Sequence, residues 1–343
     1  MNLIGIIKYK DTTQAREIRV IGVIPGKREG FSMIFSKRQV KSLRKAGVKA
    51  KDFFLYSRTN PFILFKEFIR LWYEIKNFHP DIIHAHYGTM TAFVCAISSF
   101  INRIPLVITF RGSDLNKTSI DGFLRDLMGR ILSQFSALRA AGIICVSRKL
   151  REKLWWNKNL VEVIPVGVDV EFFCPVPKNK ARILLKWKLD GKVVLFNAHN
   201  PKVKRLDIAE ASITEAKRYI PNIHLEALKG DILPEKMPFY LNASDCLLVT
   251  SDSEGSPNIV KEGLACNLPV VSVDVGDIPD RIDGVFPSMI VERNPKALGK
   301  AIVEILEMDC RSNGRSIIQE QLSEEKITRK IIGVYKKITN MGQ

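Results

Sequence analysis

Two glutamates, Glu254 and Glu262, stand eight positions apart in the segment TSDSEGSPNIVKEGLACNLPVVSVD. Between them, Ser256 followed by Pro257 is typical of a helix start, because the hydroxyl can cap free N–H groups and proline suits the first helical position. Such a helix end favours an anion, most often a phosphate. Gly255 would let a ligand approach the backbone closely. The segment therefore predicts an anion site between a strand end and a helix start, with carboxylates beside it for hydroxyl groups.

The two glutamates allow other interpretations. A metal site is disfavoured, because no His or Asp stands at helix spacing beside Glu262 and nothing resembles H-E-x-x-H. An acid/base pair would need both carboxylates to flank one bond, as in glycoside hydrolysis. A helix cap beside a solvated carboxylate is the purely structural alternative, and it stays open at this point.

A second group of polar residues follows a predicted strand in the segment NAHNPKVKRLDIAEA. Lys202, Lys204 and Arg205 place cations in a strand-to-helix loop, where a diphosphate would lie. A solvated basic loop is the structural alternative. Because the Glu254 loop lies in the same half of the chain, a nucleotide diphosphate is the simplest ligand for both segments.

A third group lies in the first half of the chain. Gly30 belongs to a loop that leads to a basic helix, and the segment HAHYG places His84 and His86 two residues apart at a strand end. The segment TFRGSDLN puts Arg111 and Asp114 at another strand end. We rank this second pair above His86 as candidate site residues, since a lone histidine on such a strand is more often structural. The His spacing alone is weak evidence for a metal.

Short apolar runs alternate with helical patterns through the whole chain, which favours parallel sheets buried on both faces. Each half is therefore expected to be a doubly wound α/β domain that binds ligands at the carboxyl ends of its strands. We expect domains over residues 1–168 and 169–323, followed by a helix in 324–343 that could pack back on the first domain. The expected strands are 18–24, 81–86, 105–110, 142–147, 161–166, 192–198, 224–228, 245–251 and 269–274, and the expected helices are 32–46, 61–77, 89–101, 122–139, 206–219, 257–266 and 296–308.

Composition restricts the class of protein and its partners. The 343 residues carry a net charge of +17, and residues 1–170 hold 28 Lys+Arg against 13 Asp+Glu, so the first half is the basic one. This half is expected to meet an anionic partner, such as lipid headgroups, nucleic acid or a phosphorylated substrate. Six scattered cysteines suit reduced thiols in a cytoplasm. The opening residues turn polar too soon for a signal peptide, and no run approaches the length of a membrane span.

In their order along the chain, these segments resemble glycosyltransferase family 4, whose members are retaining enzymes of the GT-B fold. Glu254 and Glu262 match the family's E-x7-E region. The further segments that fit are PDIIHAHYG, TFRGSDL, VSRKL, VIPVGVDVEFFCP, KRLDIAEA and PVVSVDVGDIPD. The resemblance implies a central cleft, a nucleotide sugar on the C-terminal domain and an acceptor on the N-terminal domain. It implies no metal and no further cofactor.

The resemblance also implies roles for individual residues. Glu254, with Gly255 and Ser256, would contact the donor sugar, and Glu262 would hold the ribose. Lys204, beside His199 and Arg205, would neutralise the diphosphate of a UDP- or GDP-sugar. Arg111, Asp114 and Glu254 form the expected catalytic set, and Gly30, His86 and Arg111 the expected acceptor side. Arg111 and His199 depart from the family pattern, which often has His and Arg, respectively, at these positions.

The sequence as a whole predicts a retaining glycosyltransferase of surface polysaccharide or glycolipid synthesis, acting on a saccharide or lipid-linked saccharide. We expect it in the cytoplasm, at the inner face of an anionic membrane, and we expect no nucleic-acid partner. The segment 60–78, rich in aromatic residues and cations, could lie at that membrane or be a core helix. A sugar-nucleotide epimerase of the same fold and a basic nucleic-acid-binding protein are the alternatives.

Overall fold

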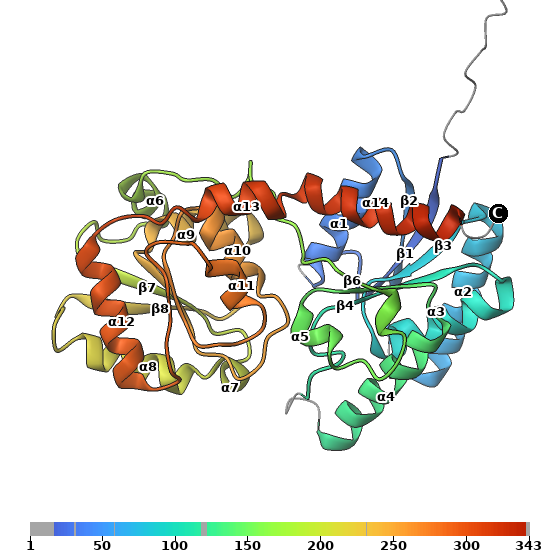
Figure 1. The fold of residues 1–343 in the computed structure, drawn as a ribbon, viewed down its shortest axis with the longest axis horizontal. Helices are drawn as coiled ribbons and strands as arrows, with labels where there is room; N and C mark the ends of the chain where they lie inside the picture. Colours follow the sequence, from blue (N-terminus) through green and yellow to red (C-terminus); the bar gives the residue numbers. More distant parts are fainter. Residues whose placement is uncertain (1–16, 31, 58, 118–121, 231, 341–343) are drawn as a thin grey trace, which may run out of the picture.

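The computed structural model describes residues 17–30, 32–57, 59–117, 122–230 and 232–340. The opening segment, which the sequence suggests is not a signal peptide, lies outside them. The described chain forms two α/β domains side by side (Figure 1). Their sheets are wholly parallel, with strand orders β2-β1-β3-β4-β5-β6 and β11-β10-β9-β7-β8. The predicted fold class, two Rossmann-like domains facing a cleft, is confirmed.

The N-terminal sheet is built from apolar runs that are buried on both faces. Residues of IIHA in β3, LVITF in β4 and GIIC in β5 are all buried. Continuous apolar strands of this kind require helices on both sides of a sheet. The strands are β1 (Arg19–Pro25), β2 (Lys49–Leu55), β3 (Ile82–Ala85), β4 (Leu106–Phe110), β5 (Gly142–Cys145) and β6 (Val161–Val163), and the helices are α1 (Ile34–Lys45), α2 (Pro61–Phe78), α3 (Thr89–Asn102), α4 (Phe123–Arg139) and α5 (Arg148–Arg151), with a 3-10 turn at Lys158–Leu160.

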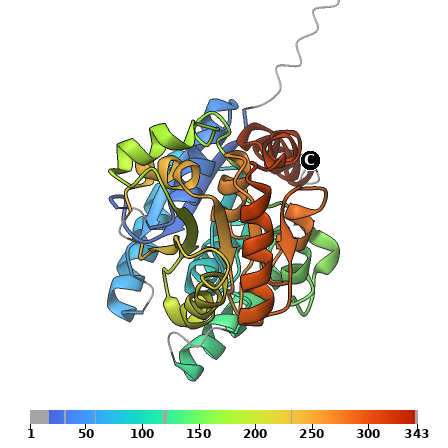
Figure 2. The same ribbon diagram turned by 90° about the vertical axis from the view of Figure 1, so that its left-hand side faces the viewer.

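The C-terminal sheet is enclosed in the same way. In Figure 2, which looks onto this domain, α12 lies in front of the sheet. The strands are β7 (Lys192–Asn197), β8 (Ile223–Leu228), β9 (Cys246–Val249), β10 (Val270–Ser272) and β11 (Met289–Ile290). The helices are α6 (Lys178–Leu185), α7 (Pro201–Lys204), α8 (Leu206–Ala216), α9 (Met237–Ala243), α10 (Asn258–Ala265), α11 (Ile278–Ile282), α12 (Pro295–Met308), α13 (Gly314–Leu322) and α14 (Glu324–Asn340), with a 3-10 turn at Pro234–Lys236.

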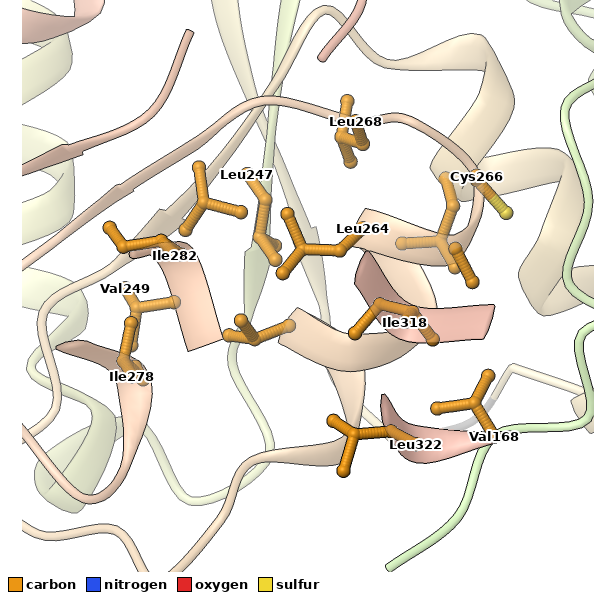
Figure 3. Packing of buried hydrophobic residues seen from close by; sticks show 14 of the residues in the cluster. Val168, Leu247, Val249, Leu264, Cys266, Leu268, Ile278, Ile282, Ile318 and Leu322 are labelled. Carbon is orange, nitrogen blue, oxygen red and sulfur yellow. The ribbon is translucent and has the colours of Figure 1, made fainter. Parts of the chain in front are cut away.

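The core of the C-terminal domain fixes α10, the helix that carries Glu262. Leu264 of α10 lies close to Ile318 of α13, and Val168 of the interdomain connection lies beside Leu322 (Figure 3). These side chains are buried almost completely, and burying each contributes about 1.5–3 kcal/mol. Because the opposite face of α10 looks into the cleft, this packing also sets the position of Glu262.

The chain crosses between the domains twice, and the two crossings lie side by side. The Val168 N–H donates to the Leu322 carbonyl at 2.9 Å, and the Glu324 N–H donates to the Val168 carbonyl at 2.8 Å. After the second crossing, α14 packs on the N-terminal domain beside α1 (Figure 1). The described chain therefore begins and ends on the same domain.

A buried hydrogen bond joins α14 to the N-terminal sheet. The Tyr335 hydroxyl lies 2.6 Å from His84 Nδ1, and Thr109 Oγ1 lies 2.7 Å from His84 Nε2. Burial and the nearby charge of Arg111 lower the pKa of His84 to about 3, so the ring is neutral at pH 7. A neutral imidazole has one donor and one acceptor, and two hydroxyls satisfy both.

We therefore expect Tyr335→Phe to lower the free energy of unfolding by about 1–3 kcal/mol, because one buried imidazole nitrogen loses its partner. Denaturant unfolding measures the change. The control is Lys330→Ala, an exposed position on the same helix, which should leave stability nearly unchanged. Equal stability of Tyr335→Phe and wild type would contradict the structural role of this bond.

Candidate active site in the interdomain cleft

A cavity of about 400 Å³ lies between the two domains, where the carboxyl ends of both sheets face each other. Its lining combines cations and carboxylates with apolar side chains. The N-terminal domain and the connection contribute Ile34, Phe35, Arg38, Arg111, Val146, Val166 and Phe173, and the C-terminal domain contributes Lys204, Glu254, Ser256, Pro257, Asn258, Ile259 and Glu262, among others. The structure thus brings Arg111 of one domain to the same cavity as the two predicted glutamates of the other.

The backbones of the two domains touch at the base of the cleft. A Cβ added at Gly255 would lie 2.2 Å from the Arg111 carbonyl oxygen, a distance at which real atoms clash. Asn116 strengthens the contact by donating from Nδ2 to the Glu254 carbonyl at 3.3 Å. Only glycine fits at position 255 while the two loops remain in contact.

Lys204 and Glu254 form an ion pair on the C-terminal wall. Ser251 Oγ also donates to Glu254 Oε1, at 2.8 Å. The Thr250 hydroxyl donates to the Lys204 carbonyl at 2.7 Å and so fixes the end of α7. Both charged side chains are largely buried yet line the cavity, which makes them available to a ligand that offers a better-matched partner.

Glu262 extends from α10 toward the N-terminal domain. Arg38 of α1 reaches across the cleft to within 3.6 Å of its carboxylate. Phe172 and Phe173 each lie 5.6 Å from the Arg38 guanidinium and hold it by cation–π contact. Burial raises the pKa of Glu262, and the charge of Arg38 opposes this shift.

Arg38 and its aromatic support were not found from the sequence. The surrounding letters KRQVKSLRK indicated a basic helix but not which cation faces the cleft. Phe35, one turn away from Arg38 on the same helix, also lines the cavity and stacks on Arg111 with 4.7 Å between the guanidinium and the ring centre.

The start of α10 faces the cavity, but the predicted cap is wrong. Pro257 occupies the N-cap position and no side chain caps the helix. Ser256 Oγ instead accepts from Lys261 Nζ at 3.0 Å, and the same ammonium donates to the Val166 carbonyl at 3.1 Å. The first N–H groups of α10 are therefore left without a side-chain cap, beside the cavity lining at Asn258 and Ile259.

Lys261 is a buried cation that the sequence analysis missed. Its side chain is fully buried, and burial lowers its pKa to about 8, although the nearby Asp277 carboxylate opposes the shift. A lysine inside the apolar pattern NIVKEGLA was the signal that could have found it. Its two bonds tie the start of α10 to the interdomain connection.

Arg111 takes the central place on the N-terminal wall. Its Nε donates to the His86 carbonyl at 3.1 Å and its Nη2 donates to Gln39 Oε1 at 2.9 Å. Burial lowers the pKa of the guanidinium to about 10, so it remains charged at pH 7. A fixed cation of this kind can bind an anionic or strongly polar group of a substrate.

Asp114 and His86 lie behind Arg111 and not on the cavity. The Asp114 carboxylate is fully buried and accepts from the N–H groups of Gly88, Arg111 and Gly112 at 2.8–3.0 Å. Burial raises its pKa, while these bonds act in the opposite direction. His86 is fully buried beside His84. Asp114 and the His86 carbonyl both accept hydrogen bonds from Arg111, and the expected roles of Asp114 in catalysis and of His86 on the acceptor side stay predictions.

Three further predicted residues are not among the cavity lining. Gly30 lies in an exposed loop, where its carbonyl accepts from Lys37 Nζ at 2.9 Å. His199 is exposed and lies against Gly230. Arg205 forms ion pairs with Asp207 and Asp252 on the outer surface. Within the described ranges, no group of three or more His, Cys, Asp or Glu side chains could hold a metal ion.

Comparison with known families agrees with this geometry. The family model for Glycosyltransferase Family 4 matches residues 16–172, and the model for Glycosyl transferases group 1 matches residues 207–308. The first match covers the N-terminal domain, and the second lies within the C-terminal domain. Together the two models show that the chain is a glycosyltransferase of the family 4 type.

Individual relatives agree as well. The chain is 25% identical over 294 residues to a proposed teichuronic acid biosynthesis glycosyltransferase, TuaC, of Bacillus subtilis, covering 77% of this chain and 72% of the relative. Among solved structures, sucrose-phosphate synthase from Thermosynechococcus elongatus superposes with a TM-score of 0.75 at 16% identity, covering 94% of this chain and 100% of the other. Anabaena HepE in complex with UDP-glucose gives 0.72 at 16% identity, with the same two coverages.

A third structural likeness bears on the alternative reaction. A UDP-N-acetylglucosamine 2-epimerase from Listeria monocytogenes superposes with a TM-score of 0.62 at 12% identity, covering 93% of this chain and 96% of the other. At such identities the structural likenesses establish the fold alone. The choice between transfer and epimerisation therefore depends on the family models and on the site.

The contact between the domains predicts the effect of Gly255→Ala. We expect the rate of sugar transfer to fall about 100-fold, because a misplacement of roughly 1 Å at a reacting centre has that effect. The thermal unfolding midpoint should change little, since neither domain core is touched. Gly333→Ala, where an added Cβ meets nothing within 4 Å, is the control and should transfer sugar normally. A wild-type rate in Gly255→Ala would contradict the role of this contact.

Proposed function

We propose that the protein transfers a sugar from a nucleoside diphosphate donor to a saccharide or lipid-linked saccharide, with retention of configuration at the anomeric carbon. The observation that carries the proposal is the C-terminal wall of the cleft, where Lys204, Glu254, the start of α10 and Glu262 line one cavity. These four features suit the three parts of such a donor: Glu254 suits its sugar, Lys204 and the start of α10 suit its diphosphate, and Glu262 suits its ribose. The complex of Anabaena HepE with UDP-glucose supports a nucleotide-sugar ligand for this fold.

The order of groups along the wall supports one orientation of the donor. The N–H groups at the start of α10 and the Lys204 ammonium suit the diphosphate. Glu262, farther along α10, would accept hydrogen bonds from the ribose hydroxyls. Glu254, in the loop before the helix, would accept hydrogen bonds from the sugar hydroxyls. Because Lys204 is paired with Glu254 in the structure, donor binding would exchange that carboxylate for a phosphate at the ammonium.

The chemistry follows from where charge develops. As the bond between the anomeric carbon and the diphosphate breaks, negative charge grows on the leaving phosphate and positive charge on the sugar ring. Lys204 and the α10 N–H groups stabilise the leaving group without having to reorganise. These are the protein's own positive charges, which is why we propose a metal-independent reaction. The acceptor hydroxyl attacks from the same face and passes its proton to the departing phosphate.

The acceptor would enter from the N-terminal side of the cleft, where Arg111 and Phe35 form the wall. The excess of 28 Lys+Arg over 13 Asp+Glu in residues 1–170 suits an acceptor that carries phosphate or lies on an anionic surface. We propose a role in surface polysaccharide or glycolipid synthesis at the cytoplasmic face of a membrane. The similarity to TuaC, a proposed teichuronic acid biosynthesis enzyme, supports it.

The two alternative functions, an epimerase and a nucleic-acid-binding protein, are tested separately. An epimerase would convert a UDP-sugar in the absence of any acceptor, and incubation with UDP-N-acetylglucosamine alone followed by product analysis detects this. A nucleic-acid-binding protein has no support from the family models, which match glycosyltransferases in both halves.

The donor site predicts a selective thermal shift. Among UDP-, GDP- and ADP-sugars, we expect one nucleotide to raise the unfolding midpoint, because a ligand that binds only the folded state stabilises it. Glu262→Gln should reduce that shift strongly. The carboxylate can accept hydrogen bonds from two ribose hydroxyls, whereas the amide has only one acceptor oxygen. Glu304→Gln, exposed on α12, is the matched control and should respond like wild type. No shift with any nucleotide sugar would contradict the donor assignment.

The leaving-group role of Lys204 predicts a change in rate. We expect Lys204→Met to lower kcat by about 10²–10³-fold, the typical effect of removing one donor that stabilises developing negative charge. Release of the nucleoside diphosphate during transfer provides the assay. Lys202→Met, at an exposed position on the same short helix, should keep most of the activity. Equal loss in both variants would argue against a specific role for Lys204.

A further inference from the structure

Helices α2, α3 and α4 cover one face of the N-terminal sheet, and α1 and α14 cover the other. In Figure 1 the three helices lie together at the right and lower right, with α4 lowest. Helix α3 packs closely on α4 and also contacts α2, so the three helices form one continuous layer. We call the outer surface of this layer the α2–α4 face. It lies on the opposite side of the N-terminal sheet from α14.

The α2–α4 face exposes large apolar side chains in ordered stripes. On α4, Leu124 is 75% exposed, Met128 61% and Phe135 54%. The same helix buries small and polar residues on its inner side, among them Ser133 and Ala137. A surface helix of a globular protein normally shows the reverse pattern, with its apolar stripe toward the core.

The other two helices extend the same pattern. On α3, Phe100 is 71% exposed, and Ile97 and Ile101 accompany it. On α2, Phe62 is 80% exposed and Phe65 is 65% exposed. Helix α2 continues the stripe with Ile69 and Tyr73 while it buries Leu71 and Ile75 on its inner side. An exposed apolar surface that spans three helices marks an interaction site.

The acidic residues of the α2–α4 face are all paired with cations, so the charges that remain unpaired there are positive. Glu67 pairs with Arg70, Glu74 lies 2.5 Å from Lys51, and Asp126 lies 3.3 Å from Arg130. Those are all the acidic residues of α2 and α4, and α3 has no charged residue.

Exposed cations remain around the apolar stripes. Lys66 and Lys76 of α2 and Arg103, which follows α3, are exposed, and among the described residues none of the three forms an ion pair. An apolar surface rimmed by cations complements an anionic lipid headgroup layer.

We propose that the α2–α4 face docks on an anionic lipid surface. Its aromatic and aliphatic side chains would enter the boundary between headgroups and acyl chains, and Lys66, Lys76 and Arg103 would contact lipid phosphates. A second copy of the chain is a poorer occupant, because self-association through this face would bring like charges together. In the described part of the chain, no helix has the length and apolar character to cross a bilayer.

One end of the α2–α4 face lies on the cleft side of the N-terminal domain. Helices α3 and α4 each follow a strand whose carboxyl end borders the cleft, so their first turns lie on the cleft side of the domain. Phe123 and Leu124, both highly exposed, belong to the first turn of α4. Docking would therefore hold the cleft near the lipid surface, although the docking itself does not depend on the transfer reaction.

Vesicle flotation tests the proposal directly. Wild-type protein is mixed with vesicles of phosphatidylcholine alone, or of phosphatidylcholine and phosphatidylglycerol in equal parts, and the floated fraction is measured. We expect strong binding to the anionic vesicles that falls with added salt, and weak binding to the neutral ones. Equal binding to both, or no binding to either, would overturn the proposal.

Matched variants locate the surface. The triple variant Leu124→Ser, Met128→Ser, Phe135→Ser should bind anionic vesicles about tenfold more weakly or worse, because it removes buried apolar area. The control Ile183→Ser, Leu184→Ser, Leu189→Ser removes equally exposed apolar side chains from the C-terminal domain and should bind like wild type. Circular dichroism and the unfolding midpoint verify that both variants fold.

A second comparison keeps the proposal testable if the triple variant does not fold. Lys66→Glu with Lys76→Glu reverses two exposed charges without touching an apolar side chain, and it should bind anionic vesicles several-fold more weakly. If both variants bind anionic vesicles as strongly as the wild-type protein does, the proposal is overturned. A wild-type dimer that the triple variant abolishes, without vesicle binding, would assign the face to a second copy instead.

Discussion

The close approach of two backbones at the base of the cleft is the constraint on which the site depends. Gly255 of the C-terminal domain lies so near the Arg111 carbonyl that no side chain fits between them. This contact sets the spacing across the cavity, and at that spacing the Arg38 guanidinium lies 3.6 Å from the Glu262 carboxylate. The paired crossings at Val168 and Ser323 hold the domains together on the opposite side. The cleft is thus defined by a backbone contact at its base and a double connection at its edge.

The charges of the cleft satisfy one another in the structure. Lys204 pairs with Glu254, and Arg38 pairs with Glu262. A buried carboxylate without a partner would be costly, so these pairs hold the four side chains in place. A ligand with phosphates and hydroxyls could exchange with the internal partners at small cost in hydrogen bonding. The same physical feature therefore stabilises the protein and prepares it to bind a donor.

Much of the fold and part of the site could be predicted from the sequence. Continuous apolar runs predicted the parallel strands, and the loop chemistry around Glu254, Glu262 and Lys204 indicated residues that do line one cavity. Arg38 could not be found, because its importance arises from contact with the other domain. The surroundings of Asp114 could not be predicted either, since only the fold shows that three backbone N–H groups donate to its carboxylate. Local patterns predict elements well, and long-range contacts decide what each polar side chain does.

The central claim is that a nucleoside diphosphate binds between the start of α10 and the facing wall of α1. Hydrogen exchange with and without UDP tests it most directly, because it locates binding along the chain without requiring a known acceptor. We expect slower exchange in the segment 254–262 of the C-terminal domain and in α1 around Arg38. Unchanged exchange in both segments, or slowing confined to the outer surface of either domain, would contradict the account.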